Sequence, residues 1–260
     1  MAAALIGGML QQGFTAAQIN VVEISAENRD KIKHTFDISA VVELMAGVLE
    51  SDVIILAVKP QQLKTLAQEL APLLQHQMVI SIAAGIRATD ISRWLGGHPC
   101  VVRAMPNTPA LVRSGVTGLY ALPAVNAQER KNAETILAAV GNVLWVEQED
   151  MLHTITAISG SGPAYVFYFI EAMQQAGMEL GLDADQARQL SLQTFSGAVK
   201  LASQSSDDVA VLRTRVTSKG GTTEQAIQAM EKSEIKRKII NAIHAANTRS
   251  KELSDELGGQ

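Results

Sequence analysis

The sequence has a single cysteine, Cys100, among its 260 residues. An internal disulfide is therefore excluded, and the composition fits a reducing compartment such as the cytoplasm. Cys100 is expected to be a buried strand residue, with a nucleophilic role as the alternative. No apolar run reaches the roughly 18 residues that a membrane span requires. The apolar residues 1–13 lack a basic region before them, so they predict a short helix and not a signal peptide.

Basic blocks and metal-binding motifs are missing as well. The net charge is −4 without a cluster of Lys or Arg, which argues against nucleic acid as a partner. The five histidines show no metal-ligand spacing, and neither HExxH nor CxxC occurs, so no metal site is predicted. No nucleophile elbow accompanies a serine, and the acidic residues form no obvious pair. The chemistry is therefore expected to come mostly from a cofactor and a bound substrate.

Residues 1–149 alternate apolar runs with segments of helical spacing. Strands are expected at 19–24, 52–58, 78–83, 100–104, 116–122 and 143–146, and helices at 28–49 (with a break near Asp37), 61–74, 88–95 and 127–140. This alternation predicts an α/β domain with a doubly wound parallel sheet of Rossmann type. Ligands on such sheets bind beyond the carboxyl ends of the strands, which directs attention to residues 57–60, 83–85 and 103–109.

Residues 150–260 show helical patterning only, and predict an all-helical second domain. Residues 165–170 are apolar all round a helix, so a partner subunit is expected to share their burial. Residues 159–163, Ser-Gly-Ser-Gly-Pro, mark a break before this helix. Ser161 is a candidate cap for the helix, and phosphate binding by the same residues is the alternative.

The stretch 216–227, VTSKGGTTEQAI, combines two glycines with four hydroxyl side chains before a new helix. One interpretation is a plain helix start, with Thr222 and Gln225 as a capping box. The other is an anion seat, because consecutive backbone N–H groups at a helix start attract negative charge. The local pattern leaves both interpretations open.

The Gly-rich fingerprint of dinucleotide-binding domains, G-x-G-x-x-G, is absent. The chain begins inside the helix that such a turn would precede. A shortened chain or a misplaced start is expected, because a domain without its central strand would expose two unpaired edges.

Five motifs occur in one order along the chain: AVKP at 57–60, SIAAG at 81–85, VRAMPNTPALV at 102–112, SGSGPAYVF at 159–167 and TSKGGTTEQA at 217–226. With these motifs the chain resembles pyrroline-5-carboxylate reductase, the last enzyme of proline synthesis, along essentially its whole length. The resemblance implies a Rossmann domain at 1–149 that lacks its first strand, and a helical substrate-binding and dimerisation domain at 150–260. It also implies a cytoplasmic homodimer with interlocked subunits, often within a ring of dimers.

The activity implied by the resemblance is reduction of 1-pyrroline-5-carboxylate to L-proline. NADPH is the expected cofactor, and NADH is the alternative. A related imine or keto-acid reductase on the same two-domain plan is a second interpretation. The missing Gly-rich turn motivates a third, a non-catalytic nucleotide-sensing relic.

The resemblance also implies cofactor-binding residues, namely Met1, Ala2, Ser25, Val58, Lys59, Pro60, Ala83, Ala84, Gly85, Asn107 and Thr108. Met1 and Ala2 match the last two residues of the family's GxGNMA-like turn, and Ser25 matches a contact with the 2′-phosphate of NADP. Glu23 ends the second expected strand, where an acidic side chain would bind a ribose 2′-hydroxyl and repel a phosphate. Arg29 is a candidate for compensating that repulsion.

For the substrate, the resemblance implies that Ser218 and the N–H groups of Gly220, Gly221, Thr222 and Thr223 hold the carboxylate. The Thr223 hydroxyl would hydrogen-bond the ring nitrogen, which makes Ser218 and Thr223 the candidate catalytic residues. Thr223 is too weak an acid to be a strong proton donor by itself, so orientation and solvent relay are the expected roles.

Overall fold

The computed structural model describes residues 1–258. The chain divides into two compact units. One unit combines Met1–Ser161 with the C-terminal segment from Ala246, and the other is Gly162–Ala245. The predicted domain boundary between residues 149 and 150 stays a prediction, because compactness alone does not define a domain that folds by itself.

The first unit contains a sheet and its covering helices. Its elements are α1 (Ala2–Gln11), η1 (Ala16–Gln18), α2 (Ala26–Phe36), α3 (Leu44–Val48), β1 (Val53–Leu56), α4 (Pro60–Leu70), η2 (Ala71–Leu73), β2 (Met78–Ser81), α5 (Ala88–Trp94), β3 (Val101–Met105), η3 (Thr108–Val112), β4 (Gly115–Ala121), α6 (Ala127–Ala138), β5 (Gly141–Trp145), α7 (Met151–Ile155) and η4 (Thr156–Gly160), followed by the end of α12.

The five strands lie in the order β1-β2-β3-β4-β5, and every neighbouring pair is parallel except β3 and β4. The predicted doubly wound parallel sheet is confirmed in its main part, while β4, and β5 beside it, run opposite to β1, β2 and β3. The connection 106–114 contains Pro106 and Pro109 and only the short η3. It is shorter than the dozen or so residues that a parallel crossover needs, so the chain returns antiparallel.

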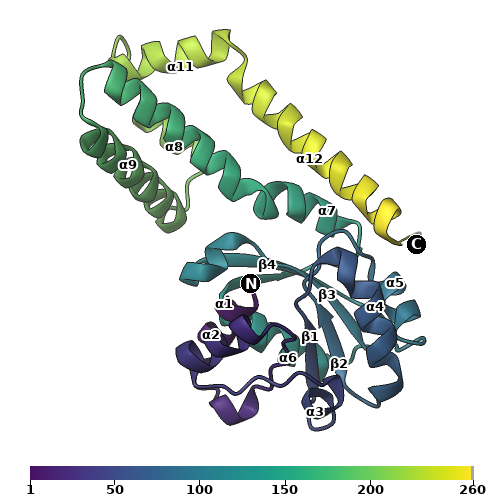
Figure 1. The fold of residues 1–260 in the computed structure, drawn as a ribbon. Helices are drawn as coiled ribbons and strands as arrows, with labels where there is room; N and C mark the ends of the chain where they lie inside the picture. The colour runs from purple at the N-terminus through teal and green to yellow at the C-terminus, as the bar shows by residue number, and fades with distance from the viewer. Residues whose placement is uncertain (259–260) are drawn as a thin grey trace. The chain divides into compact units, whose positions relative to one another are not determined.

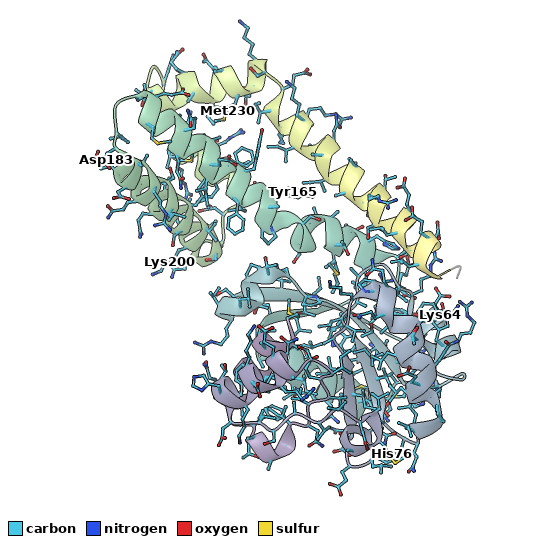
Figure 2. All side chains as sticks on the ribbon, viewed as in Figure 1. Lys64, His76, Tyr165, Asp183, Lys200 and Met230 are labelled. Atoms are coloured by element: carbon cyan, nitrogen blue, oxygen red, sulfur yellow. The ribbon has the colours of Figure 1, made fainter. Side chains whose placement is uncertain are left out.

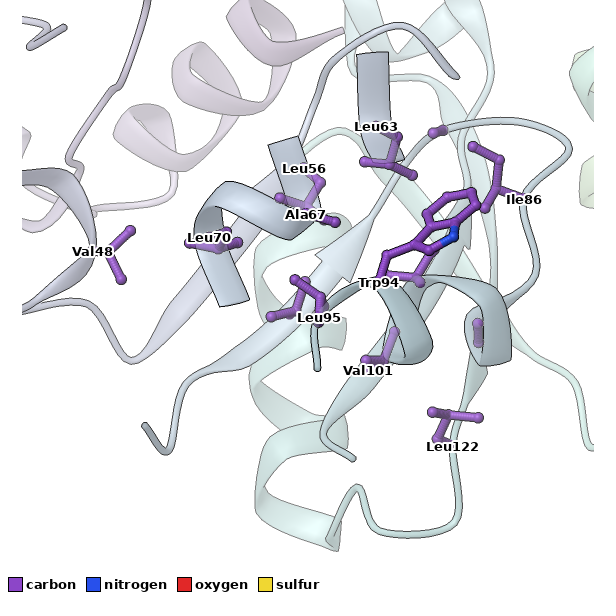
Figure 3. Packing of buried hydrophobic residues seen from close by; sticks show 14 residues of the cluster. Val48, Leu56, Leu63, Ala67, Leu70, Ile86, Trp94, Leu95, Val101 and Leu122 are labelled. Carbon is purple, nitrogen blue, oxygen red and sulfur yellow. The ribbon is translucent and has the colours of Figure 1, made fainter. Parts of the chain in front are cut away.

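Helices cover both faces of the sheet (Figure 1). One core cluster joins α4 and α5 to the sheet, and the other two join α1 and α6 to it. Helix α4 illustrates why the sequence folds this way: Leu63, Ala67 and Leu70 recur at helical spacing and are all buried. Figure 3 shows them in the cluster that also contains Trp94. Confirmed helical spacing thus fixes which face of α4 meets the sheet.

The region before β1 differs from its prediction. Residues 19–24 were expected to form a strand, but only an isolated parallel bridge joins Val22 to Val41. Asp37 ends α2 in the left-handed conformation, with φ of 56°, which is the predicted break. The helix expected beyond this break is limited to α3, because the chain around Val41 is extended and pairs with Val22 instead.

The second unit is helical. It contains α8 (Gly162–Glu179), α9 (Ala184–Gln204), α10 (Val209–Arg215), α11 (Thr222–Lys232) and the first part of α12 (Ile235–Gly258). Asp183 begins α9 with a capping box, and lies where the chain turns back from α8 (Figure 2). Gly177 permits close approach there, because a Cβ at this position would lie 3.2 Å from the Ala187 Cβ.

Large apolar side chains remain exposed in the helical unit. Phe167 and Tyr168 of α8 are 65% and 72% exposed, and Val199 of α9 is 64% exposed. The described chain therefore does not itself bury the aromatic run on α8. None of the helices within residues 1–258 is both long and apolar enough to cross a membrane.

The predicted break at 159–163 is confirmed at Ser161, a bend between the end of η4 at Gly160 and the start of α8 at Gly162. Residues Thr156–Gly160 form a π-helical turn, η4, in which the Ser161 N–H donates to the Thr156 carbonyl. Ser161 itself has helical backbone angles, φ −85° and ψ −22°, so it does not have the extended backbone of an N-cap for α8. Ser159 and Gly160 belong to a widened helical turn, and such π turns are frequent at functional sites.

Candidate active site

Three of the motif loops lie at one edge of the sheet. Residues 57–60 follow β1, residues 82–85 follow β2 and residues 106–108 follow β3. Because β1, β2 and β3 are mutually parallel neighbours, their carboxyl ends meet at the same edge. Gly85 takes φ of +77°, which a residue with a side chain rarely adopts. The backbone conformation therefore explains why the SIAAG motif ends in glycine. The fold thus brings most predicted cofactor residues together.

The loop after β3 is fastened to the π turn. The Asn107 amide nitrogen donates to the carbonyl and the hydroxyl of Ser159, both at 3.1 Å. Its amide oxygen accepts from the Val116 N–H at 2.9 Å. Met105 packs against Gly160, where an added Cβ would lie 2.6 Å from the Met105 Cε. The PNTP motif at 106–109 and the SGSG motif at 159–162 therefore pack against each other and are joined by hydrogen bonds.

Helix α1 presents free donors at its start. Met1 is the N-cap, Leu5 is the first residue whose N–H bonds back, to the Met1 carbonyl, and the first turn holds no acidic residue. The N–H groups of Ala2, Ala3 and Ala4 consequently have no backbone acceptor within residues 1–258. Helix α1 contacts η3, which follows β3, and Figure 1 shows the N-terminus at that end of the sheet. Such a helix start suits a phosphate group.

A buried ion pair lies beneath the strand ends. Arg103 of β3 is 2% exposed, and its guanidinium donates to the Glu149 carboxylate at 2.9 Å. The same carboxylate oxygen accepts from the N–H of Ala88, the first residue of α5, at 2.7 Å. Glu149 thereby joins β3, the start of α5 and the segment before α7. Sequence reasoning missed this pair, because the residues are far apart in the chain.

The end of α12 packs against this unit. Leu253 and Leu257 contact Gly85, and Asp255 forms an ion pair with Arg87. Ser250 is hydrogen-bonded to the buried ring of His153 at 2.9 Å. Burial lowers the pKa of His153, and the positive charge of Arg103 adds to this effect.

The His153 pair predicts a pH-dependent stability. The native ring resists protonation, whereas the unfolded ring protonates below its usual pKa of about 6.5. The stabilisation is therefore complete above pH 6.5 and is lost as the pH falls from there through the native pKa, by at most about 1.4 kcal/mol per pH unit. Urea unfolding between pH 7.5 and 5 should show a shallower decline for His153→Gln than for the parent. The exposed His34 provides the control, and an equal change in slope in His34→Gln would contradict the assignment.

In the helical unit, the 216–227 stretch forms a tight turn before α11. Gly220 takes φ of +75°, and Gly221 is the N-cap of α11. The Gly221 N–H donates to the Ser218 carbonyl, and the Gly220 N–H donates to the Glu224 carboxylate at 2.7 Å. The predicted capping box of Thr222 and Gln225 is therefore wrong, since Gly221 is the N-cap and the side chain that reaches back to the turn is that of Glu224. A left-handed Gly220 moves the start of the helix back by one residue.

Two of the predicted substrate donors, the N–H groups of Gly220 and Gly221, thus already have hydrogen-bond acceptors within the turn. The N–H groups of Thr222, Thr223 and Glu224 have no backbone acceptor within residues 1–258. Both threonines are exposed, and the hydroxyl of Thr223 has no hydrogen bond to the described residues. The turn therefore presents N–H groups and a free hydroxyl together. Ser218 and the four predicted donor residues stay predictions as substrate contacts.

Other candidates for chemistry have structural explanations. Cys100 is buried, as expected, and burial with a nearby Glu129 raises the pKa of its thiol to about 12. A thiol in that state is a poor nucleophile. Within residues 1–258 no cluster of three His, Cys, Asp or Glu residues could hold a metal ion.

Comparisons with known proteins fit this arrangement. The family model described as NADP oxidoreductase coenzyme F420-dependent matches residues 1–85. The model described as pyrroline-5-carboxylate reductase dimerisation matches residues 149–253. The class of protein is therefore a two-domain oxidoreductase, with a Rossmann-type nucleotide domain before a helical dimerisation domain.

Relatives identify the family within this class. The pyrroline-5-carboxylate reductase of Pseudomonas aeruginosa is 46% identical over 99% of this chain and 95% of its own length. That of Pasteurella multocida is 40% identical over 97% and 94%. A solved pyrroline-5-carboxylate reductase from Coxiella burnetii matches with a TM-score of 0.92 and 41% identity, over 97% of this chain and 94% of its own. The chain belongs to the pyrroline-5-carboxylate reductase family.

Proposed function

We propose that this protein reduces 1-pyrroline-5-carboxylate to L-proline. NAD(P)H supplies a hydride to the carbon of the ring C=N bond; the double bond becomes a single bond, and the nitrogen gains a proton. The carrying observation is the 46% identity to the Pseudomonas aeruginosa enzyme across nearly both whole chains. A solved relative from Plasmodium falciparum, 28% identical over 97% of this chain and 94% of its own with a TM-score of 0.87, has NADP bound.

The nucleotide would lie along the carboxyl edge of the sheet. The free N–H groups at the start of α1, beginning with Ala2, would take the pyrophosphate. Residues 58–60 and 83–85 would line the bound nucleotide, and Thr108 would lie near the nicotinamide. The Asn107 amide already bonds Ser159 and Val116, so its proposed role is to position the loop.

The turn before α11 would hold the substrate. The open N–H groups of Thr222 and Thr223, together with the partial positive charge of the helix start, suit a carboxylate. Ser218 lies in the same turn and would add a hydroxyl. The free hydroxyl of Thr223 would orient the ring nitrogen, with solvent delivering the proton.

An enzyme assay tests the proposal. The purified protein should oxidise NADPH or NADH only when 1-pyrroline-5-carboxylate is present, with L-proline as the product. Oxidation of the proline analogue thiazolidine-4-carboxylate in the reverse direction should accompany it. Activity restricted to an open-chain keto acid would instead identify a related reductase. Nucleotide binding without turnover of either substrate would identify a sensor; no specific observation favours these alternatives.

The proposed working form is a cytoplasmic homodimer. The exposed Phe167 and Tyr168 lie in the part of the chain that matches the family's dimerisation model. Interlocking of two helical units would cover these side chains. The proposal extends to rings of dimers, which light scattering of the purified protein would detect.

A further inference from the structure

The segment between α1 and α2 holds a carboxylate in an unusual position. Val21–Glu23 is extended and pairs with Val41, because the Glu23 N–H donates to the Val41 carbonyl at 2.9 Å. The chain then turns at Ser25, the N-cap of α2. In dinucleotide-binding folds the residue at the end of the fold's second strand faces the adenosine ribose, and the extended segment 21–23 corresponds to that strand, not the strand labelled β2. By this correspondence Glu23 would lie near the ribose 2′ position, where NADPH carries a phosphate and NADH a hydroxyl.

The Glu23 carboxylate folds back over the start of α2. One of its oxygens accepts from the Ser25 N–H at 2.8 Å, and the other from the Asn28 side-chain amide at 3.3 Å. These donors are of the kind that would hold a 2′-phosphate. The contrast with α1 is direct, because the first turn of α1 has no acidic residue and its N–H groups are open. At α2 the protein's own anion already occupies the donors.

The neighbouring cation does not neutralise this carboxylate. Arg29 donates through Nη1 to the backbone carbonyls of Glu23 and Ile24, at 3.0 and 2.8 Å. No ion pair between Arg29 and Glu23 occurs within residues 1–258. Lys31, one helical turn from Glu27, is paired with that residue. A 2′-phosphate would therefore meet the negative charge of a carboxylate that is not ion-paired with Arg29.

We propose that Glu23 is the residue by which this protein discriminates against the 2′-phosphate, so that NADH is used at least as well as NADPH. The inference rests on the proposed function, since it concerns the nucleotide of that reaction. With NADH, the carboxylate accepts a hydrogen bond from the ribose 2′-hydroxyl. With NADPH, it competes with the phosphate for the Ser25 N–H and repels it.

Glu23→Gln tests the proposal, because the amide removes the charge and keeps an oxygen that can accept from the Ser25 N–H, although its NH2 group replaces the oxygen that accepts from Asn28. Dissociation constants for NADPH and NADH are measured by titration with the purified full chain. We expect the ratio Kd(NADH)/Kd(NADPH) to rise about tenfold, equivalent to about 1.4 kcal/mol. Glu23→Ser should shift the ratio in the same direction.

Glu27→Gln is the matched control. It removes the same charge from the same helix start, but its side chain is 77% exposed and paired with Lys31. An unchanged ratio in both Glu23 variants, or an equal shift in Glu27→Gln, overturns the proposal. Thermal unfolding of each variant separates loss of folding from loss of selectivity.

Failure of the proposed function is visible separately. Nucleotide binding with the expected shift, but without reduction of 1-pyrroline-5-carboxylate, would reject the activity and keep the role of Glu23. Reduction of 1-pyrroline-5-carboxylate with an unchanged ratio Kd(NADH)/Kd(NADPH) in the Glu23 variants would support the activity and reject the role of Glu23. Binding of neither nucleotide to the parent protein would reject both.

Discussion

Replacement of Thr223 by alanine is expected to lower kcat/KM for 1-pyrroline-5-carboxylate by roughly 10²-fold. The hydroxyl is exposed at the second residue of α11, and it has no hydrogen bond to residues 1–258, so nothing in the described chain competes for it. Its removal would leave the ring nitrogen unoriented while the carboxylate donors, which are backbone N–H groups, remain. The nucleotide dissociation constant should stay unchanged, because Thr223 belongs to the proposed substrate site.

Two further substitutions separate the hydroxyl from the shape of the side chain. Thr223→Ser keeps the hydroxyl and should recover most of the activity, whereas Thr223→Val keeps the shape and should not. The exposed position predicts a change of less than about 0.5 kcal/mol in stability for all three variants. A parallel loss of NADPH affinity in Thr223→Ala would show that the residue acts on the nucleotide, and the assignment to the substrate would then be wrong.

The sequence pattern predicts correctly those features that depend on residues close together in the chain, such as a helix. The helical spacing of residues 61–74 predicted a helix, and the structure confirms it as α4, with Leu63 and Leu70 on its buried side. Strand direction is different, because an apolar run reads the same in either direction. The shortness of the 106–114 connection was the available signal that β4 returns antiparallel.

The turn before α11 shows a second limit of prediction from the sequence. Thr222 with Gln225 fits the capping-box pattern, which needs a side-chain acceptor at the N-cap, and this pattern favoured the wrong residue. In the structure the N-cap is Gly221, which has no side chain. This helix start depends on Gly220, whose positive φ lets Glu224 reach back to its N–H. The motifs predicted that three loops meet at the sheet edge, but they did not reveal that the Asn107 amide is already bonded to Ser159 and Val116.

The buried pair of Arg103 and Glu149 lay beyond sequence reasoning altogether. Arg103 stands within an apolar strand, and 46 residues separate it from its partner. A charge in such a strand signals that a partner must exist, because an unpaired buried charge is costly. It does not say which acidic residue that partner is.

Arg103→Met is accordingly expected to destabilise the fold by about 3–5 kcal/mol. Methionine replaces the buried stem of Arg103 with a flexible apolar side chain. It leaves the Glu149 carboxylate largely buried, with only the Ala88 N–H as a partner among residues 1–258. Urea unfolding followed by circular dichroism measures the loss. The double variant Arg103→Met with Glu149→Gln removes the stranded charge, so it should be more stable than Arg103→Met alone.

An exposed pair supplies the control for this prediction. Lys31 and Glu27 form an ion pair with side chains 66% and 77% exposed, and Lys31→Met should cost less than about 1 kcal/mol. Comparable losses in the two single variants would mean that burial does not set the cost of breaking the Arg103 pair. If the double variant were no more stable than Arg103→Met, the loss would come from packing around β3 and not from the stranded carboxylate. Either result would remove the ion pair as the reason why β3, the start of α5 and the segment before α7 hold together beneath the strand ends.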